Sequence, residues 1–153
     1  MKTDHFSLER RDGIAVVEMR RNERLNAFNE SMFEQMEAVT SELARKLPRA
    51  IVITGAGSYF SAGFDVQPDN PMVGRIIESA SSSSGAEQAG KLIAAIRRSI
   101  DGFVSLPVPI VAALNGNAYG GGAELAVRCD LRVMDPGAVI CFSEVKLGLM
   151  SDW

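Results

Sequence analysis

Three consecutive glycines, Gly120 to Gly122, stand just before Glu124, and this combination could bind and transform a polar substrate. The apolar run Pro109–Leu114 precedes them, and a helical pattern follows. The first N–H groups of a helix have no partner within it, so the glycines could direct theirs at a substrate oxygen. Helical side chains tilt toward the N-terminus, so the Glu124 carboxylate could reach the same volume. We therefore expect an oxygen-binding amide and a carboxylate in one pocket; the alternative is that the glycines serve only tight packing.

A second glycine-rich segment, Gly55–Val66, follows the short apolar run Ala50–Thr54. Ligands of parallel sheets bind beyond the carboxyl ends of the strands, so this segment is a second candidate site. Its first three residues resemble the turn that binds a nicotinamide dinucleotide. That alternative is disfavoured, because such a site needs glycines where Tyr59 and Ser61 stand and a first strand nearer the N-terminus.

Composition disfavours several other classes of protein. The chain has 153 residues, which suits one domain, and 46% are hydrophobic and 23% charged, as in ordinary globular proteins. A net charge of −3 offers no basic surface for nucleic acid. His5 is the single histidine, so we expect neither a Ser-His-Asp triad nor a metal site. Cys129 and Cys141 match no disulfide framework or zinc pattern, and we predict reduced core residues.

We also expect no targeting or membrane segment. Residues 1–5 lead into charged residues, unlike a secretory signal peptide, and no apolar run approaches the ~20 residues of a spanning helix. The expectation is a cytoplasmic protein that binds no membrane.

Hydrophobic periodicity predicts an α/β protein. Asp12 and Gly13 predict a hairpin between strands at 6–10 and 14–19. Asn29 is expected to cap a helix that is followed by the strand Ala50–Thr54, and this order implies a parallel sheet. The apolar face of that helix is expected to contain Met32, Met36, Val39, Leu43 and Leu47.

The remaining segments give a mixed pattern. Residues 67–90 lack periodicity, so we expect a mobile loop or a poorly ordered helix there, with Ser81 to Ser84 as a solubilising stretch. Residues 92–104 predict an amphipathic helix that Pro107 ends. A short helix is expected at 120–129, and short strands at 131–134 and 138–142.

With these elements in place, the chain resembles the enoyl-CoA hydratase/isomerase, or crotonase, superfamily over almost its whole length. The motifs that carry the resemblance occur in order: Arg24–Phe28, Ser61–Val66, Asn115–Glu124 and Ser143–Leu149. The resemblance implies a spiral of repeated ββα units, with residues 1–153 as one core domain. Family members usually continue into a C-terminal helical segment, so the expected match is to the N-terminal core only. It also implies a homo-oligomer, a trimer or a dimer of trimers.

The resemblance implies an acyl-CoA thioester substrate and no separate cofactor, since coenzyme A is part of the substrate. It assigns an oxyanion hole to the backbone amides of Ala62 and Gly121, which we expect to lack other acceptors. Two such donors stabilise the charge of a thioester enolate, and the loss of one typically costs ~10² to 10³ in rate. The substrate-binding residues that the resemblance implies are Leu25, Ala27, Ala62, Asp65, Val66 and Gly121.

Two carboxylates suggest the reaction. The hydratases of the superfamily carry one at each position matching Glu124 and Glu144, and such a pair can hold a water and move its protons. The sequence therefore predicts an enoyl-CoA hydratase. The alternatives are an isomerase, a hydrolase or a ring-forming synthase on the same scaffold, or a non-catalytic protein. Without the resemblance, Glu144 would be interpreted as an exposed turn residue.

Overall fold

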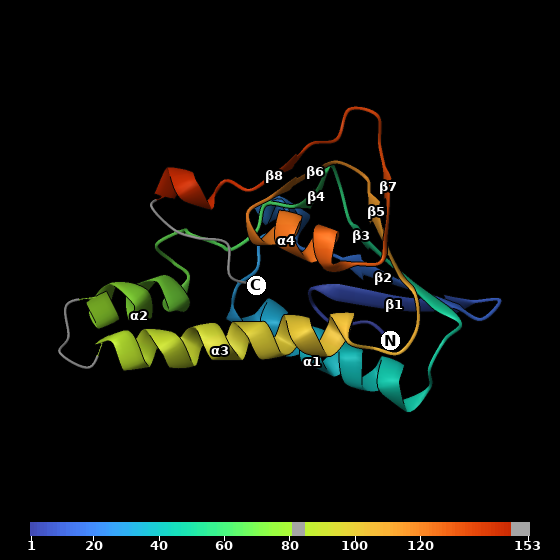
Figure 1. Ribbon diagram of the computed structural model, residues 1–153, viewed down its shortest axis with the longest axis horizontal. Coiled ribbons are helices and arrows are strands. Elements are labelled where there is room, and N and C mark those ends of the chain that lie inside the picture. Colours follow the sequence, from blue (N-terminus) through green and yellow to red (C-terminus); the bar gives the residue numbers. More distant parts are fainter. Residues whose placement is uncertain (81–84, 148–153) are drawn as a thin grey trace.

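The computed structural model describes residues 1–80 and 85–147, which contain two sheets and the helices that cover them (Figure 1). The five-stranded sheet has the order β1-β2-β3-β5-β7 and the three-stranded sheet the order β4-β6-β8. The strands are β1 Phe6–Arg11, β2 Ile14–Met19, β3 Ala50–Gly55, β4 Tyr59–Ser61, β5 Ile110–Leu114, β6 Asn117–Tyr119, β7 Leu131–Met134 and β8 Ile140–Cys141. The helices are α1 Glu30–Arg45, α2 Pro71–Ala80, α3 Gly85–Val104 and α4 Gly121–Arg128, with short 3-10 turns η1 Asn22–Arg24 and η2 Glu144–Leu147.

The larger sheet confirms the predicted hairpin and parallel strands. β1 and β2 pair antiparallel across Asp12 and Gly13, whose φ angles of 50° and 82° suit a tight hairpin turn. β2, β3, β5 and β7 then pair in parallel. Because parallel strands end at the same edge, the segments that follow β3 and β5 lie close together.

The core lies between this sheet and α1 and α3, which lie side by side along the bottom of Figure 1. Asn29 caps α1 as predicted, since its Oδ1 accepts the Met32 N–H at 3.0 Å. The apolar face is confirmed for Met32, Met36, Val39 and Leu43, all of which are buried. Leu47 was expected on this face but is 48% exposed, because the helix ends at Arg45.

The segment expected to be a loop or poorly ordered helix contains the helix α2, and α3 begins at Gly85, before the predicted residue 92. The signals that start α2 are local: Pro71 occupies the first helical position, and Asn70 Oδ1 accepts the Met72 N–H at 3.2 Å. Figure 1 shows α2 packed beside α3 and extending away from the sheets. The expectation for Ser81 to Ser84 lies outside the described residues.

The smaller sheet was only partly predicted. β4 and β6 have three residues each, too few for a periodic signal, and β8 is the centre of the strand expected at 138–142.

Two asparagines stabilise the chain where it leaves the larger sheet. Asn26 Nδ2 donates to the carbonyls of Ala56 and Tyr59, each at 2.9 Å, and Asn115 Oδ1 accepts the Gly55 N–H at 3.0 Å.

Within residues 1–80 and 85–147, no helix is both long and apolar enough to cross a membrane. The same residues contain no group of three or more histidine, cysteine, aspartate or glutamate side chains that could hold a metal ion.

The two cysteines differ in their surroundings. Cys129 is 4% exposed and Cys141 is half-buried, so the predicted core position is confirmed only for Cys129. Burial raises the pKa of the Cys129 thiol from 9.0 to about 12, although the nearby Arg132 opposes this rise. Its thiol therefore stays protonated at neutral pH.

This difference predicts selective alkylation. Because the thiolate is the reactive form, iodoacetamide at pH 8 should modify Cys141 in the folded protein and leave Cys129 unmodified. Intact-mass measurement should show one added group before unfolding in urea and two after it. Equal rates of modification at both positions in the folded protein would contradict the burial of Cys129.

Candidate active site

The two glycine-rich segments lie in direct contact. Gly63 has φ of +87°, and a methyl group on its Cα would lie 2.6 Å from the Tyr119 carbonyl oxygen and 2.8 Å from the Gly121 nitrogen. No side chain fits in that space, and a left-handed φ independently favours glycine. The segments predicted to form one site are therefore brought together, backbone against backbone.

Gly120 fixes the start of α4. Its φ of 52° and ψ of −128° are accessible almost only to glycine. Its N–H donates to the Cys141 carbonyl at 2.9 Å, and its own carbonyl accepts the Glu124 N–H at 3.0 Å. Gly121 is then the first residue of the helix, and its N–H forms no hydrogen bond within the described residues.

The expectation that the Ala62 amide lacks an acceptor is wrong. The Ala62 N–H donates to the Leu25 carbonyl at 2.9 Å. A backbone N–H already bonded to a carbonyl is not available to a substrate oxygen without losing that bond.

The amide of Phe64 has the property expected of Ala62. Phe28 pairs with the two neighbours of Phe64: its N–H donates to Gly63 O at 2.7 Å, and its carbonyl accepts the Asp65 N–H at 2.9 Å. In a parallel pairing of this kind, the N–H of the central residue faces away from the partner. Across residues 1–80 and 85–147, nothing accepts a hydrogen bond from the Phe64 N–H. The expected free amide is therefore found two residues after Ala62, in the same segment.

Glu144 lies beside the start of α4. A methyl group on Gly120 would be 3.5 Å from Glu144 Oε1, and both carboxylate oxygens are buried without a hydrogen bond in the described part of the chain. The interpretation as an exposed turn residue is therefore wrong. Burying a polar group without a partner costs ~1–3 kcal/mol or more, so such a group marks a place where a ligand or water completes the contacts.

Glu124 lies in the first turn of α4 and is 6% exposed. Its backbone bond to Gly120 places it one turn from the residue that Glu144 contacts. The structure thus brings both glutamates to the amino end of α4. The shared water between their carboxylates remains a prediction.

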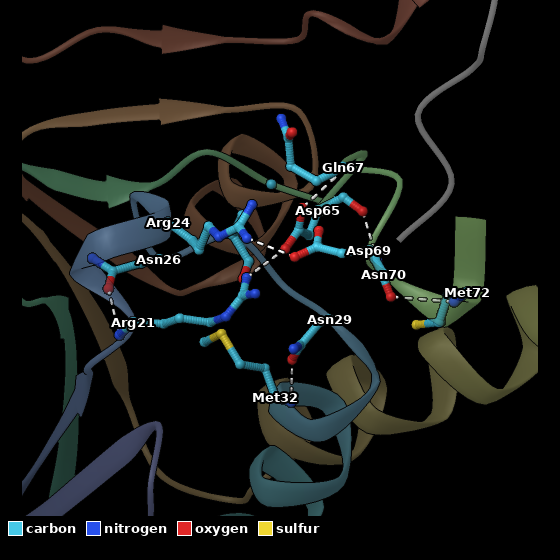
Figure 2. Close-up of polar contacts among 12 residues, drawn as sticks. Arg21, Arg24, Asn26, Asn29, Met32, Asp65, Gln67, Asp69, Asn70 and Met72 are labelled. Carbon is cyan, nitrogen blue, oxygen red and sulfur yellow. Dashed lines mark hydrogen bonds and ion pairs between the residues drawn. The ribbon is translucent and has the colours of Figure 1, made fainter. Parts of the chain in front are cut away.

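The residues expected to bind the substrate divide into two groups. Leu25 and Val66 are exposed, at 41% and 51%, whereas Ala27 and Asp65 are buried. Figure 2 shows that the Asp65 carboxylate faces the Arg21 guanidinium, with Nη1 and Oδ2 2.6 Å apart. That carboxylate has a protein partner, which the motif did not reveal.

The sequence and the fold both match a known family. The sequence profile described as enoyl-CoA hydratase/isomerase matches residues 9–153, nearly the whole chain. The chain belongs to the enoyl-CoA hydratase/isomerase family. The fold agrees: the crystal structure of an enoyl-CoA hydratase from Shewanella pealeana superimposes with a TM-score of 0.80 at 26% identity, covering 96% of this chain and 52% of that one.

Curated relatives in the enoyl-CoA hydratase/isomerase family have more than one activity. The short-chain-enoyl-CoA hydratase of Clostridium acetobutylicum is 32% identical over 151 residues, which cover 97% of this chain and 53% of that protein. The ethylmalonyl-CoA decarboxylase of Gallus gallus is 28% identical over 142 residues, covering 92% and 44%. The chain spans about half the length of the curated relatives it matches.

The close contact at Gly63 predicts a position in this family member that tolerates no side chain. Gly63→Ala should lower the free energy of unfolding by ~1–3 kcal/mol, since alanine is strained at positive φ and its methyl group has no room. Gly74→Ala on α2 is the matched control, because nothing lies within 4 Å of the added methyl group. It should be neutral or stabilise by ~0.5–1 kcal/mol. Urea unfolding measures both changes, and equal stability of the two variants would contradict the packing.

Proposed function

We propose that this protein is an enoyl-CoA hydratase, which adds water across the 2,3 double bond of an enoyl-CoA thioester. The observation that carries the proposal is the buried Glu144 carboxylate. It lies without a hydrogen bond, among the described residues, beside the helix start that also holds Gly121 and Glu124. This arrangement supplies an anion-stabilising amide and two carboxylates in one region.

In the proposed oxyanion hole, the amides of Phe64 and Gly121 replace the pair first expected. The support is that the Ala62 N–H is bonded to Leu25, whereas the other two N–H groups form no bond within residues 1–80 and 85–147. Their segments touch through Gly63. A thioester oxygen bound there would become an enolate oxygen during the reaction, and fixed donors stabilise the added charge without reorganising.

The two glutamates would then manage the water. One carboxylate accepts a proton as the water oxygen bonds to C3 of the substrate. The electron pair of the double bond moves toward the thioester oxygen, and C2 then takes the proton that the water released, relayed between the two carboxyl groups, so that both groups return to their starting state. The product is a 3-hydroxyacyl-CoA, so one water is consumed and no electron leaves the system. Positioned acid–base groups of this kind typically contribute 10² to 10⁴ in rate.

The coenzyme A portion of the substrate is placed, in this proposal, along the backbone around Leu25 and Val66, beside the buried Ala27. The side chains of Leu25 and Val66 are exposed and lie close in sequence to the isolated bridge between Phe28 and Phe64. Asp65 is excluded from direct contact through its carboxylate, because Arg21 occupies it.

Glutamine substitutions test the paired carboxylates. Glu124→Gln and Glu144→Gln should each reduce hydration of a short 2-enoyl-CoA by about 10² to 10⁴, because each removes a proton-transfer group while keeping its size. The double variant should lose far less than the product of the two effects, since the pair acts as a unit. The loss of enoyl-thioester absorbance measures the rate. Glu34→Gln, on the exposed side of α1, is the control and should retain full activity.

The same assay separates the alternatives. An isomerase that relies on one acid would tolerate Glu124→Gln and fail with Glu144→Gln. A hydrolase would release a free thiol from a saturated acyl-CoA, and a non-catalytic protein would convert none of these substrates. Wild-type rates in both single variants would show that the paired-carboxylate mechanism is wrong.

We also propose a homo-oligomer, a trimer or a dimer of trimers. The edge strand β7 exposes Leu131, Val133 and Met134, and the chain that follows exposes Val139, Phe142 and Val145, which a second subunit could cover. Exposed apolar patches often mark interaction sites.

Sedimentation velocity tests the assembly. The protein should sediment as an oligomer at micromolar concentration, and Val133→Lys should shift it toward the monomer, because a charge would replace an apolar side chain that is 65% exposed. Lys91→Gln, on the exposed surface of α3, is the control and should leave sedimentation unchanged. A wild-type monomer under these conditions would contradict the proposal.

A further inference from the structure

Asp65 follows Phe64 directly, and both oxygens of its side chain are bonded to protein. Oδ2 lies 2.6 Å from Arg21 Nη1, and Oδ1 accepts the Gln67 N–H at 3.0 Å (Figure 2). The Asp65 side chain is 3% exposed and the Arg21 side chain 11%. A carboxylate held in this way acts on its own chain, not on a substrate.

The backbone N–H and carbonyl of Asp65 are also hydrogen-bonded to protein. Its N–H donates to the Phe28 carbonyl at 2.9 Å, and its carbonyl accepts from Asn70 Nδ2 at 2.6 Å. Asn70 in turn caps the first turn of α2 through Met72. Asp65 is therefore a junction at which the segment carrying Phe64, the segment carrying Phe28 and the start of α2 are joined.

Arg21 also joins the segment that carries Phe28 to the segment that carries Phe64. Its Nη1 also donates to the Ala27 carbonyl at 2.9 Å, and its backbone N–H donates to Asn26 Oδ1 at 3.0 Å. The guanidinium thus binds both the 21–28 segment and the residue after Phe64. Removing both charges from water costs several kcal/mol per ion, so the pair is weak evidence for a purely stabilising role.

The pair closes a short ladder between these two segments. The ladder has three hydrogen bonds, donated by the N–H groups of Ala62, Phe28 and Asp65. Their acceptors are the carbonyls of Leu25, Gly63 and Phe28, in that order. A rotation of the 62–65 backbone would change the direction of the Phe64 N–H. Catalytic donors must be held to within about 0.5 Å and 10–20° of the productive geometry.

We propose that Arg21 and Asp65 are positioning residues, which hold the Phe64 N–H in the direction required for a thioester oxygen. This inference rests on the proposed function. It replaces the expectation that Asp65 binds the substrate, and it gives the buried ion pair a role in the rate of the reaction.

The test uses Asp65→Asn and Arg21→Lys. The asparagine presents an amide to the guanidinium or loses the Gln67 contact, and the lysine keeps the charge but not the planar group. Each substitution should lower kcat for hydration about 10- to 100-fold, which does not exceed the loss expected when a donor is removed outright. KM should change less than about threefold.

A spectroscopic measurement reports on the hole without turnover. Donors that polarise the carbonyl of a conjugated dienoyl-CoA shift its absorbance to longer wavelength on binding. Wild-type protein should show this shift, and both variants should show a smaller one although the ligand is bound. A purely structural role would leave the shift per bound ligand unchanged.

A double variant separates a loss of positioning from a loss of folding. Arg21→Met combined with Asp65→Leu removes both charges together, and apolar replacements of buried ion pairs often preserve or increase stability. Thermal unfolding should stay cooperative, while kcat and the absorbance shift remain reduced. Full recovery of both in this variant would overturn the proposal, because the ion pair would then not be needed for positioning.

The matched control is another arginine–carboxylate pair, which joins α2 to the first residue of α1. Arg75 Nη2 lies 2.7 Å from Glu30 Oε1, but both side chains are about half-exposed. Arg75→Lys and Glu30→Gln should leave kcat and the absorbance shift unchanged.

The remaining outcomes are separable. If wild-type protein binds the dienoyl-CoA with a shift but the Arg21 and Asp65 variants keep both shift and kcat, the positioning role is wrong and the proposed function stands. A raised KM with unchanged kcat would assign Asp65 to substrate binding and also overturn it. If wild-type protein neither binds nor hydrates, the proposed function fails and this inference fails with it.

Discussion

The contact between Gly63 and the peptide that joins Gly120 to Gly121 is the constraint on which the rest of the site depends. An added methyl group would overlap Tyr119 and Gly121, so two backbone segments approach as closely as backbone allows. The parallel sheet makes this approach possible, because β3 and β5 end at the same edge and deliver both segments there. Asn26 and Asn115 then hold the turn after β3 in place. The placement of the backbone in the sheet and its turns therefore determines the geometry of the site.

Polar groups with unusual surroundings gather at this edge. Glu144 is buried without a hydrogen bond in the described part of the chain, Glu124 is buried in a first helical turn, and Asp65 is buried with Arg21. Each of these buried polar side chains lowers the free energy of unfolding compared with an apolar residue of similar size. The opposite side of the sheet, where α1 packs, has an apolar interior of ordinary kind. This division is expected when one end of a fold is shaped for chemistry and the other for stability.

The sequence was a good guide wherever a local pattern had enough length. The hairpin, the cap at Asn29 and the parallel strands all have periodic or turn signals, and each was confirmed. β4 and β6 were missed because three residues give no period. For α2 the sequence left a loop and a poorly ordered helix as alternatives, because Pro71 can start a helix as well as break one.

The hydrogen bond of the Ala62 amide, which was expected to lack an acceptor, has a more specific cause. In an unbroken strand, neighbouring N–H groups point to alternating sides, so Ala62 and Phe64 would face the same way. The left-handed Gly63 interrupts that alternation, and the amides of both Ala62 and Asp65 face the segment around Phe28. A motif shows that a glycine is present but not which neighbouring amide it turns outward. The partner of Asp65 was hidden for a related reason, since Arg21 is 44 residues away in the chain.

The proposed oxyanion hole consists of backbone amides, and this has a consequence for how the scaffold can diversify. Every residue except proline supplies the same N–H, so position 64 can exchange its phenyl ring for another side chain without giving up the donor. The ring packs at the margin of the core, where its shape meets neighbouring side chains. In this proposal, core packing and charge stabilisation are encoded separately at one residue, the first by its side chain and the second by its main chain. Point mutation at position 64 could therefore change the packing there while the proposed donor is inherited unchanged.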